Sequence, residues 1–421
     1  MLAVCSYSQT ARYDLVIYGG TSSGAIAAYT AAKAGLKVAL IERTGHIGGM
    51  TTSGIGNVDI GWPTTVGGYT ADFLRAVGEH YGNPGRMQIA LECKVAEDLY
   101  DAWLASAGVD IVLNTRLCEK DAVKKDRDRI VSVAMEDGTV YSAPVFIDAS
   151  YEGDLMAQAG VSYIAGREAR EEFGESSAGV GEYKILRAYT KEELEQVRRV
   201  SEKYPLDIVL AEKDASGNAD DRSQAYCYRL TVTDNPDNLV PFRRPEDYDP
   251  ERYFNVLYQI RRRGAVRLGQ ILTLYPLPGQ KYDLNHMDLI NASWSYPEAD
   301  YKMREDIDMY HRRYQEGMLY FLGHDERVPE ELRKDVLRYG LAKDEYEDNG
   351  NWPYQLYIRE GRRMRGEYVM RQQDAWENPF KDDAVAVGSY FLDCHIVSSI
   401  VNKHGLHLDE GVFDYTPYRP Y

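Results

Sequence analysis

The sequence has few cysteines and histidines and no long apolar run, and each shortage excludes a class of protein. Its 421 residues include five cysteines, at positions 5, 93, 118, 227 and 394, without any CxxC pair. Their odd number and wide spacing predict neither a zinc cluster nor a disulfide framework. The eight histidines form no HExxH or HxxxH pattern, so no metal site is expected. Apolar runs stay well short of the roughly 20 residues that cross a bilayer, which predicts no membrane span.

Basic residues are too few for a nucleic-acid partner, because a phosphate backbone requires a basic face. Lys and Arg number 49 against 66 Asp and Glu, which gives a net charge of −17. The serine hydrolase motif GxSxG is absent as well, since "GTSSG" places its serines in a phosphate-loop context. Tyrosine, in contrast, is abundant: the 34 tyrosines suit sugar-like ligands and also ordinary half-buried positions.

A chain of this length is expected to form two domains. The first residues, "MLAVCSYSQT", pass from a short apolar stretch to small polar residues. We interpret residues 1–12 as the remnant of a secretory signal or, alternatively, as a frayed terminus. The first interpretation predicts a periplasmic or secreted protein, and the second leaves it in the cytoplasm.

The strongest local pattern is a strand, a helix and a second strand near the N-terminus. "DLVIY" (14–18) is a continuous apolar run, as expected of a strand buried on both faces of a parallel sheet. "SGAIAAYTAAKAG" (23–35) has helical periodicity and ends in a glycine, and "KVALIER" (37–43) is the second buried strand. The three segments predict a βαβ unit.

The turn of this unit, "YGGTSSG" (18–24), is a near match to the dinucleotide fingerprint GxGxxG, with Thr21 in place of the middle glycine. Gly19 permits a sharp turn, and Gly24 lets the helix and the strand approach closely. Residues 20–23 can offer backbone N–H groups to a pyrophosphate, to which the Thr21 hydroxyl could also donate. Glu42, at the end of the second strand, matches the acidic residue that binds a ribose hydroxyl. A tight turn without a ligand is the alternative.

The segments that follow favour FAD over a nicotinamide cofactor. The Gly48-Gly49 pair in "RTGHIGGMTTSGIG" is followed by mostly small residues. An NAD domain usually returns to a helix at this position. A helix (93–108), a strand (110–113) and a hairpin (129–143) around Asp137-Gly138 come next. The buried strand 145–148 then ends in "DASYEGD", where ligands gather at the carboxyl end of a parallel sheet. A nicotinamide-dependent dehydrogenase remains the alternative.

The middle of the chain is expected to be a substrate domain, and it holds three polar groups of interest. Helices are predicted over 190–204 and 298–322. "YIREGRRMRGEY" places Arg359, Arg362 and Arg363 on one helical face, which would suit an anionic substrate group or a solvated face paired with glutamates. "KYDLNHMD" offers Asn285 and His286 as weaker candidates.

The third group is "GSYFLDCHIV", where Asp393 and His395 stand two residues apart. On a strand, both side chains would point the same way. Such a pair could take a hydroxyl proton while a hydride leaves for a flavin. A structural histidine is the alternative.

Several of these stretches together resemble one known family, the FAD-dependent oxidoreductases of bacteria from glycan-rich environments, some of which carry the label "xanthan lyase". The resemblance covers residues 13–421. It rests on "YDLVIYGGTSSGAIAAYTAAKAGLKVALIE", "GHIGGMTTSG", "FIDASYEGDLMAQAGVSYIAGRE", "DDRSQAYCYRLTVT", "YPEADYKMREDIDMYHRRYQEGMLYFL", "YGLAKDEY", "WPYQLYIREGRRMRGEYVM" and "VGSYFLDCHIV".

The resemblance implies an α/β fold: a Rossmann-like FAD/NAD(P)-binding domain with a β-meander (13–170) and an inserted α+β substrate or cap domain (171–380). Residues 381–421 would return towards the FAD domain. "GVFDYTPYRPY" resembles the segment just before the family's last FAD-binding stretch, so we expect a truncated chain with an open flavin half-site. The implied FAD-binding residues are Gly19, Gly20, Thr21, Ser22, Ser23, Gly24, Glu42, Arg43, Gly48, Gly49, Met50, Thr51, Leu117, Ala149 and Ser150.

The function that the resemblance implies is hydride transfer between flavin and a small polar, carbohydrate-derived substrate, with an electron acceptor that the sequence does not identify. The catalytic candidates are His395, Asp393, Arg359 and Arg363. A non-catalytic remnant, or a lyase or hydrolase that uses FAD structurally, is the alternative.

Overall fold

A computed structural model describes residues 9–377, 381–391 and 393–411. The first region is built on a parallel sheet of the order β4-β3-β2-β8, in which β2 (Leu15–Tyr18) and β3 (Val38–Ile41) are central. The outer strands are β4 (Asp110–Val112) and β8 (Val145–Asp148). The predicted βαβ unit is confirmed, with α1 (Ser22–Lys33) between β2 and β3. The chain therefore has the mixed α/β architecture that the sequence predicts.

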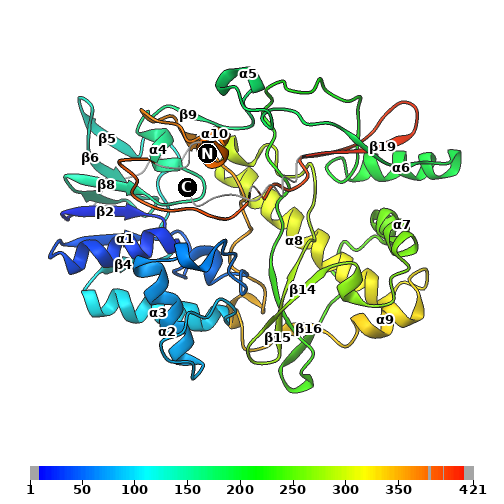
Figure 1. The fold of residues 1–421 in the computed structure, drawn as a ribbon, viewed down its shortest axis with the longest axis horizontal. Helices are drawn as coiled ribbons and strands as arrows, with labels where there is room; N and C mark the ends of the chain where they lie inside the picture. The colour runs from blue at the N-terminus through cyan, green and yellow to red at the C-terminus, as the bar shows by residue number, and fades with distance from the viewer. Residues whose placement is uncertain (1–8, 378–380, 392, 412–421) are drawn as a thin grey trace.

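Alternate residues of β2 face two different layers. Leu15 and Ile17 pack with α1, α2 (Gly68–His80) and α3 (Cys93–Ala107) on one face of the sheet. Val16 and Tyr18 pack on the other face against the meander of β5, β6 and β7 (Figure 1). Because both faces are covered, the strands are apolar throughout, as expected of a parallel sheet.

The meander consists of β5 (Val123–Asp126), β6 (Arg129–Ala134) and β7 (Thr139–Ser142). The predicted turn is confirmed: Thr139 N donates to Asp137 Oδ1 at 2.8 Å, and Gly138 has a φ of 87°. A further strand, β1 (Gln9–Arg12), pairs in parallel with β7. Residues 9–12 thus belong to the folded domain, which corrects the assignment of the whole of 1–12 to a signal remnant; residues 1–8 lie outside the described residues.

The second region is centred on a five-stranded antiparallel sheet of the order β13-β16-β12-β15-β14. The long helix α8 (Tyr301–His324) packs against this sheet and runs through the centre of the molecule (Figure 1). The other main elements are β12 (Leu230–Thr233), β13 (Leu239–Pro241), α7 (Phe254–Arg263), β14 (Thr273–Leu277), β15 (Lys281–Asn285), α9 (Glu330–Val336) and β16 (Gly340–Ala342).

A separate four-stranded sheet has the order β10-β19-β18-β11. It joins β10 (Lys184–Ala188) and β11 (Val209–Leu210) to β18 (Ser398–Val401) and β19 (Leu406–Glu410). The neighbouring helix α6 (Lys191–Lys203) begins with a capping box between Thr190 and Glu193. The strands of the expected return segment therefore pair with the middle of the chain rather than with the parallel sheet.

Short elements complete the fold. They are α4 (Asp154–Gln158), β9 (Tyr163–Ile164), α5 (Arg170–Phe173), β17 (Arg363–Met364), α10 (Gln372–Trp376) and seven short 3-10 helices within the described residues. Cys118 is disulfide-bonded, which the wide spacing of the cysteines did not predict, whereas Cys93 and Cys227 are free thiols.

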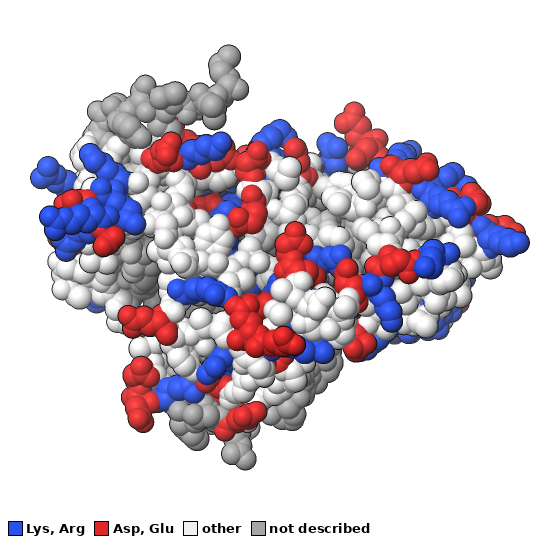
Figure 2. Space-filling model, turned by 90° about the horizontal axis from the view of Figure 1, so that it is seen from above, with Lys and Arg blue, Asp and Glu red and all other residues white. Residues whose placement is uncertain are grey.

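The surface mixes charges of both signs. Figure 2 shows acidic and basic side chains beside one another over most of one face, with a basic cluster at its left edge. The hairpin β5–β6 carries Lys124, Lys125 and Arg127 but also Asp126 and Asp128. Among the described residues, no helix has the length and apolar character needed to cross a membrane.

Candidate functional site

The turn between β2 and α1 is as tight as the fingerprint predicts. A Cβ on Gly24 would lie 2.0 Å from Gly19 O, so only glycine lets the helix approach the strand this closely. Gly19 has a φ of +102°, and a Cβ there would lie 2.5 Å from Ser150 N. The two glycines therefore bring the turn, the helix start and the end of β8 together.

Thr21 stabilises this turn from within. Its hydroxyl donates to Ala149 O at 2.8 Å and accepts from Gly24 N at 3.3 Å, which makes it the N-cap of α1. The hydroxyl is thus engaged within the protein, and its donation to a phosphate stays a prediction. A threonine in the place of the middle glycine is thus explained by helix capping and by a bond to the neighbouring strand end.

The first turn of α1 leaves donors for an anion. Within the described residues, no hydrogen bond is formed by the N–H groups of Ser22 and Ser23. These two groups lie at the positive end of a helix, where phosphates commonly bind. The N–H of Gly20 is engaged elsewhere, because it donates to Glu42 Oε2 at 2.7 Å.

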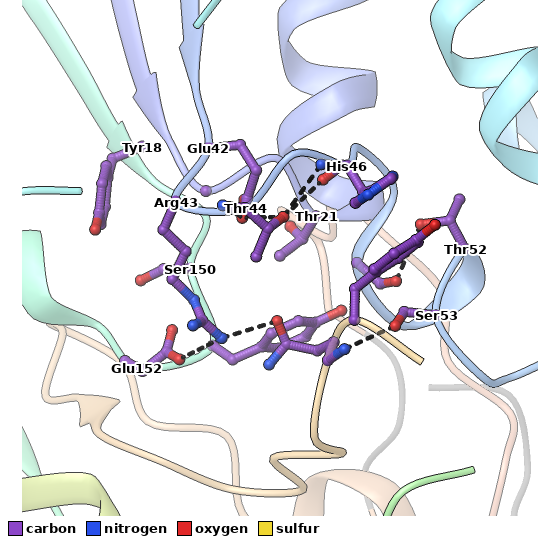
Figure 3. A pocket seen from close by; sticks show the side chains of 15 residues that line it. Tyr18, Thr21, Glu42, Arg43, Thr44, His46, Thr52, Ser53, Ser150 and Glu152 are labelled. Carbon is purple, nitrogen blue, oxygen red and sulfur yellow. Dashed lines mark hydrogen bonds and ion pairs between the residues drawn. The ribbon is translucent and has the colours of Figure 1, made fainter. Parts of the chain in front are cut away.

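Glu42 lies at the end of β3 and lines a pocket with the turn (Figure 3). Its other carboxylate oxygen accepts from Thr44 N at 2.8 Å and from Thr44 Oγ1 at 2.9 Å. The neighbouring Arg43 donates to Gln355 Oε1 at 3.0 Å and lies 3.5 Å from Glu152 Oε1. The pocket thus combines the predicted residues Gly19, Thr21, Glu42, Arg43, Gly49 and Ser150 with Tyr354 and Gln355 of the second region.

The glycine pair leads the chain past the start of α1. Gly48 N donates to Gly20 O at 2.7 Å, and the Ser22 hydroxyl donates to Gly48 O at 2.8 Å. Ser22 and Thr51 share a hydroxyl hydrogen bond of 2.8 Å. Met50 N donates to the Tyr151 hydroxyl at 2.9 Å. The segment 48–51 is therefore fixed against the turn between β2 and α1. Its contact with the cofactor stays a prediction.

Leu117 lies beside Tyr18, which lines the pocket around Glu42. Its side chain is buried, its N–H donates to the Tyr18 hydroxyl at 3.2 Å, and its carbonyl accepts from the Tyr301 hydroxyl at 3.0 Å. Tyr18 and Tyr301 line a second pocket, which shares Arg43, Glu152 and Tyr354 with the first. A contact between Leu117 and adenine stays a prediction and would replace the Tyr18 bond.

Comparison with protein families decides the cofactor. The model of the family described as "FAD dependent oxidoreductase" matches residues 14–420. The chain belongs to the FAD dependent oxidoreductase family. Its cofactor is accordingly FAD.

Similar solved structures share only part of the chain. The THI4 protein of Thermovibrio ammonificans is 20% identical over 37% of this chain and 66% of its own, with a TM-score of 0.29. The myxobacterial chondrochloren halogenase CndH is 19% identical over 37% and 41%, with a TM-score of 0.29. The L-proline dehydrogenase from P. horikoshii is 14% identical over 39% and 59%, with a TM-score of 0.28. This chain thus spans less than two thirds of each, and no protein of curated function matched it.

The residues present fit the adenosine diphosphate part of FAD. The unpaired N–H groups of Ser22 and Ser23 suit the pyrophosphate, and the buried carboxylate of Glu42 suits a ribose hydroxyl. Gly49 also matters, because a Cβ there would lie 2.4 Å from the Tyr151 hydroxyl that holds Met50. We expect these residues to hold the cofactor.

A polar cluster lies beyond the glycine segment, towards the second region. A Cβ on Gly54 would lie 2.4 Å from Arg229 O, and Gln355 N donates to Ser53 Oγ at 2.8 Å. The loop that follows Thr51 therefore packs against Arg229, which directly precedes β12. It also packs against the segment that carries Gln355 and Arg359.

His395 and Arg359 meet on a carboxylate that the sequence analysis did not single out, Asp288. His395 Nδ1 lies 2.5 Å from Asp288 Oδ2, and Arg359 Nη2 lies 3.4 Å from Asp288 Oδ1. Burial alone would raise the pKa of Asp288, but Arg359 and His395 lower it well below its ordinary value. Asp288 is therefore ionised and orients the imidazole of His395.

Two of the three guanidinium nitrogens of Arg359 bind groups of the protein itself. Its Nε donates to Ala225 O at 3.0 Å, and its Nη2 also donates to Cys227 Sγ at 3.3 Å. Burial raises the pKa of Cys227 to about 12, so this thiol is neutral and not a nucleophile at neutral pH. Arg359 thus supports Asp288, and its binding of an anionic substrate group stays a prediction.

The predicted helical face of arginines does not form. Gly361 runs so close to Tyr151 that a Cβ would lie 2.6 Å from Tyr151 O, and residues 363–364 form β17 against β9. Arg362 pairs with Asp154 and Glu298, and Arg363 pairs with Glu168. Arg362 and Arg363 therefore lie outside the cluster around Asp288.

The predicted strand through Asp393 and His395 is also wrong, because β18 begins only at Ser398. Asp393 is exposed whereas His395 is buried, so the two side chains do not share a direction. Asp393 instead acts electrostatically on Asp59, on which Arg229 and Arg359 also act. The partner of His395 is Asp288.

His286, a weaker candidate, lies beside His395, with the ring centroids 6.0 Å apart. It is exposed, and Thr273 Oγ1 lies 2.7 Å from its Nδ1. Its φ of +71° is rare for a residue other than glycine and is found at functional sites more often than elsewhere. Partial desolvation, His395 and the nearby arginines lower the pKa of His286 and outweigh the opposite effect of Asp288, so the ring is neutral at neutral pH.

Proposed function

We propose that this chain oxidises a small polar substrate, carbohydrate-derived in our preferred form of the proposal, by removing a hydride from a hydroxyl-bearing carbon. The observation that carries the proposal is the contact of His395 with Asp288 beside the loop that continues from the glycine pair. When bound, FAD supplies the hydride acceptor.

The chain's own residues supply the proton chemistry in this proposal. The substrate O–H bond breaks and its proton moves to the imidazole of His395, while the C–H bond breaks and its electron pair leaves as hydride. The C–O bond of the substrate thereby becomes a carbonyl. Asp288 stabilises the imidazolium that forms, because the carboxylate stays ionised next to it.

Position supports the same residues. Ser53 and Gly54, which follow the glycine segment, contact Gln355 and Arg229, and these residues belong to the segments that carry Arg359 and Cys227. The exposed ring of His286 marks the side of the cluster that solvent reaches. A substrate that enters there would meet His286 first and His395 next.

The test is anaerobic bleaching of the FAD-loaded chain by a panel of sugars, sugar acids and polyols, followed at about 450 nm. One compound should bleach the flavin, and an artificial electron acceptor should restore the colour and support turnover. His395→Gln should slow bleaching by roughly 100-fold or more. The matched control is His80→Gln, an exposed histidine at the end of α2.

Other outcomes point to other functions. A yellow protein that no compound bleaches, but that releases a product without electron transfer, would indicate a lyase or hydrolase with structural FAD. Bleaching that His395→Gln leaves unchanged would reject His395 as the base while retaining the oxidoreductase.

We further propose that the protein works in an oxidising compartment, the periplasm or the cell exterior. The disulfide at Cys118 supports this, because such bonds persist mainly outside the cytoplasm. Alkylation under denaturing conditions should label fewer of the five cysteines before reduction than after it. Equal labelling of protein isolated from its native host would reject the proposal.

A further inference from the structure

A further cavity lies between α8 and the five-stranded sheet. Its walls come from β13 and the loop after it, from the middle of α8, and from Gly350, Asn351 and Trp352. It is an open cavity of about 320 Å³, which lies at the lower end of the range of small-molecule sites. It shares no lining residue with the two pockets around Glu42 and Tyr18.

The charge at this cavity is positive although the chain as a whole is strongly acidic. Arg243, Arg244 and Arg312 line it together with one carboxylate, Glu316. Glu316 is already paired, with 3.0 Å between Arg312 Nε and its Oε1. In the part of the chain that the structure describes, Arg243 and Arg244 form no ion pair. Two uncompensated guanidinium groups at one opening attract an anion.

The remaining walls are largely apolar. Pro241, Phe242 and Pro245 follow one another around the arginines, and Leu319 and Trp352 connect the cavity to the core. Trp352 is 2% exposed, and its indole Nε1 is buried without a hydrogen-bond partner among the described residues. A buried donor without an acceptor is uncommon and marks a place where the protein alone does not satisfy its polar groups.

We propose that this cavity binds a small organic carboxylate with a flat apolar body. Arg243 and Arg244 bind the carboxylate, because the planar guanidinium fork matches its two oxygens. Phe242, Pro241 and Pro245 contact the apolar body. The site is independent of the proposed oxidation and does not rest on it.

The experiment is isothermal titration calorimetry of the full FAD-loaded chain at constant ionic strength, with benzoate as the probe. Phenyl phosphate serves as the counterpart with a phosphate group, and benzyl alcohol serves as the counterpart without a charge. Benzoate should bind saturably and more tightly than either. The double variant Arg243→Ala/Arg244→Ala should lower the affinity for benzoate at least about tenfold.

The control is the double variant Arg261→Ala/Arg262→Ala, which removes two adjacent exposed arginines from α7. It should leave the affinity for benzoate within about twofold, since surface charges away from a site act weakly through screened solvent. The absence of saturable heat with benzoate, or equal affinity in the Arg243/Arg244 variant, would overturn the proposal. Tighter binding of phenyl phosphate than of benzoate would assign the cavity to phosphate esters instead. Equal affinity for benzyl alcohol and benzoate would show that the arginines do not recognise the ligand.

Discussion

His395 and Asp288 are 107 positions apart in the chain, yet His395 Nδ1 lies 2.5 Å from Asp288 Oδ2. The pair forms because the segment before β18 passes the loop that follows β15. Arg359 holds the other carboxylate oxygen, so Asp288 contacts partners from two further segments. The histidine is therefore oriented by residues that no local motif contains.

Replacing Asp288 by Asn should reduce turnover of the identified substrate by roughly 10- to 100-fold, because the imidazolium loses the carboxylate that stabilises it. Steady-state rates of Asp288→Asn and of Asp393→Asn between pH 5 and 9 provide the measurement. A larger effect of Asp393→Asn would mean that the neighbour in sequence, and not Asp288, acts on His395.

The sequence predicted the parallel sheet well and the contacts of the catalytic candidates poorly, for a physical reason. Strand, helix and strand over residues 14–43 are specified by residues close to one another, through burial on both faces of β2 and through Gly24. The spacing of Arg359 and Arg363 is compatible with a helix, but Gly361 and the pairing of β17 with β9 prevent it. Pairing between distant segments decides such cases, and a single sequence does not record it.

Thr21→Ala tests the capping function found for Thr21. The substitution removes both the bond to Gly24 N and the bond to Ala149 O, so the free energy of unfolding should fall by about 1 kcal/mol. Thr21→Ser keeps the hydroxyl and should retain most of the stability. Urea unfolding of both variants, with FAD affinity measured in parallel, is the experiment. Unchanged stability with a strong loss of FAD would instead place the Thr21 hydroxyl on the pyrophosphate.

Lys281 links the two regions of the molecule through a buried ionic cluster. Its Nζ lies 2.6 Å from Glu92 Oε1, 2.8 Å from Glu345 Oε1 and 2.9 Å from Asp344 Oδ2, and the side chain is 1% exposed. Lys281→Met leaves buried carboxylates without their cation and should lower the free energy of unfolding by about 3 kcal/mol.

The matched control is Lys94→Met. Lys94 contacts Asp344 too, but its side chain is 41% exposed, so its loss should cost less than about 1 kcal/mol. Urea midpoints at neutral pH compare the two. Equal effects would show that the burial of Lys281 is not what makes the cluster important.

His46 joins the first region to the second at the edge of the cofactor pocket and gives the stability a pH dependence. Its Nδ1 lies 2.7 Å from Glu97 Oε1, its Nε2 lies 3.0 Å from Asp348 Oδ2, and its ring stacks on Tyr354 with 3.3 Å between centroids. Burial lowers the pKa of His46, but the hydrogen bonds and charges of Glu97 and Asp348 outweigh it, so the net shift from the ordinary value of 6.5 is upward. Asp101, close to Glu97, adds a further negative charge.

A pKa that is raised in the folded state means that the charged form of His46 stabilises the fold. This contribution is complete below the unfolded pKa of 6.5 and is lost as the pH rises through the higher folded pKa. The difference in Tm between the wild type and His46→Gln should therefore be largest near pH 6 and shrink at higher pH. His80→Gln, at the exposed end of α2, should show no such trend. A difference that grows with pH would mean that neutral His46, stacked on Tyr354, is the stabilising form.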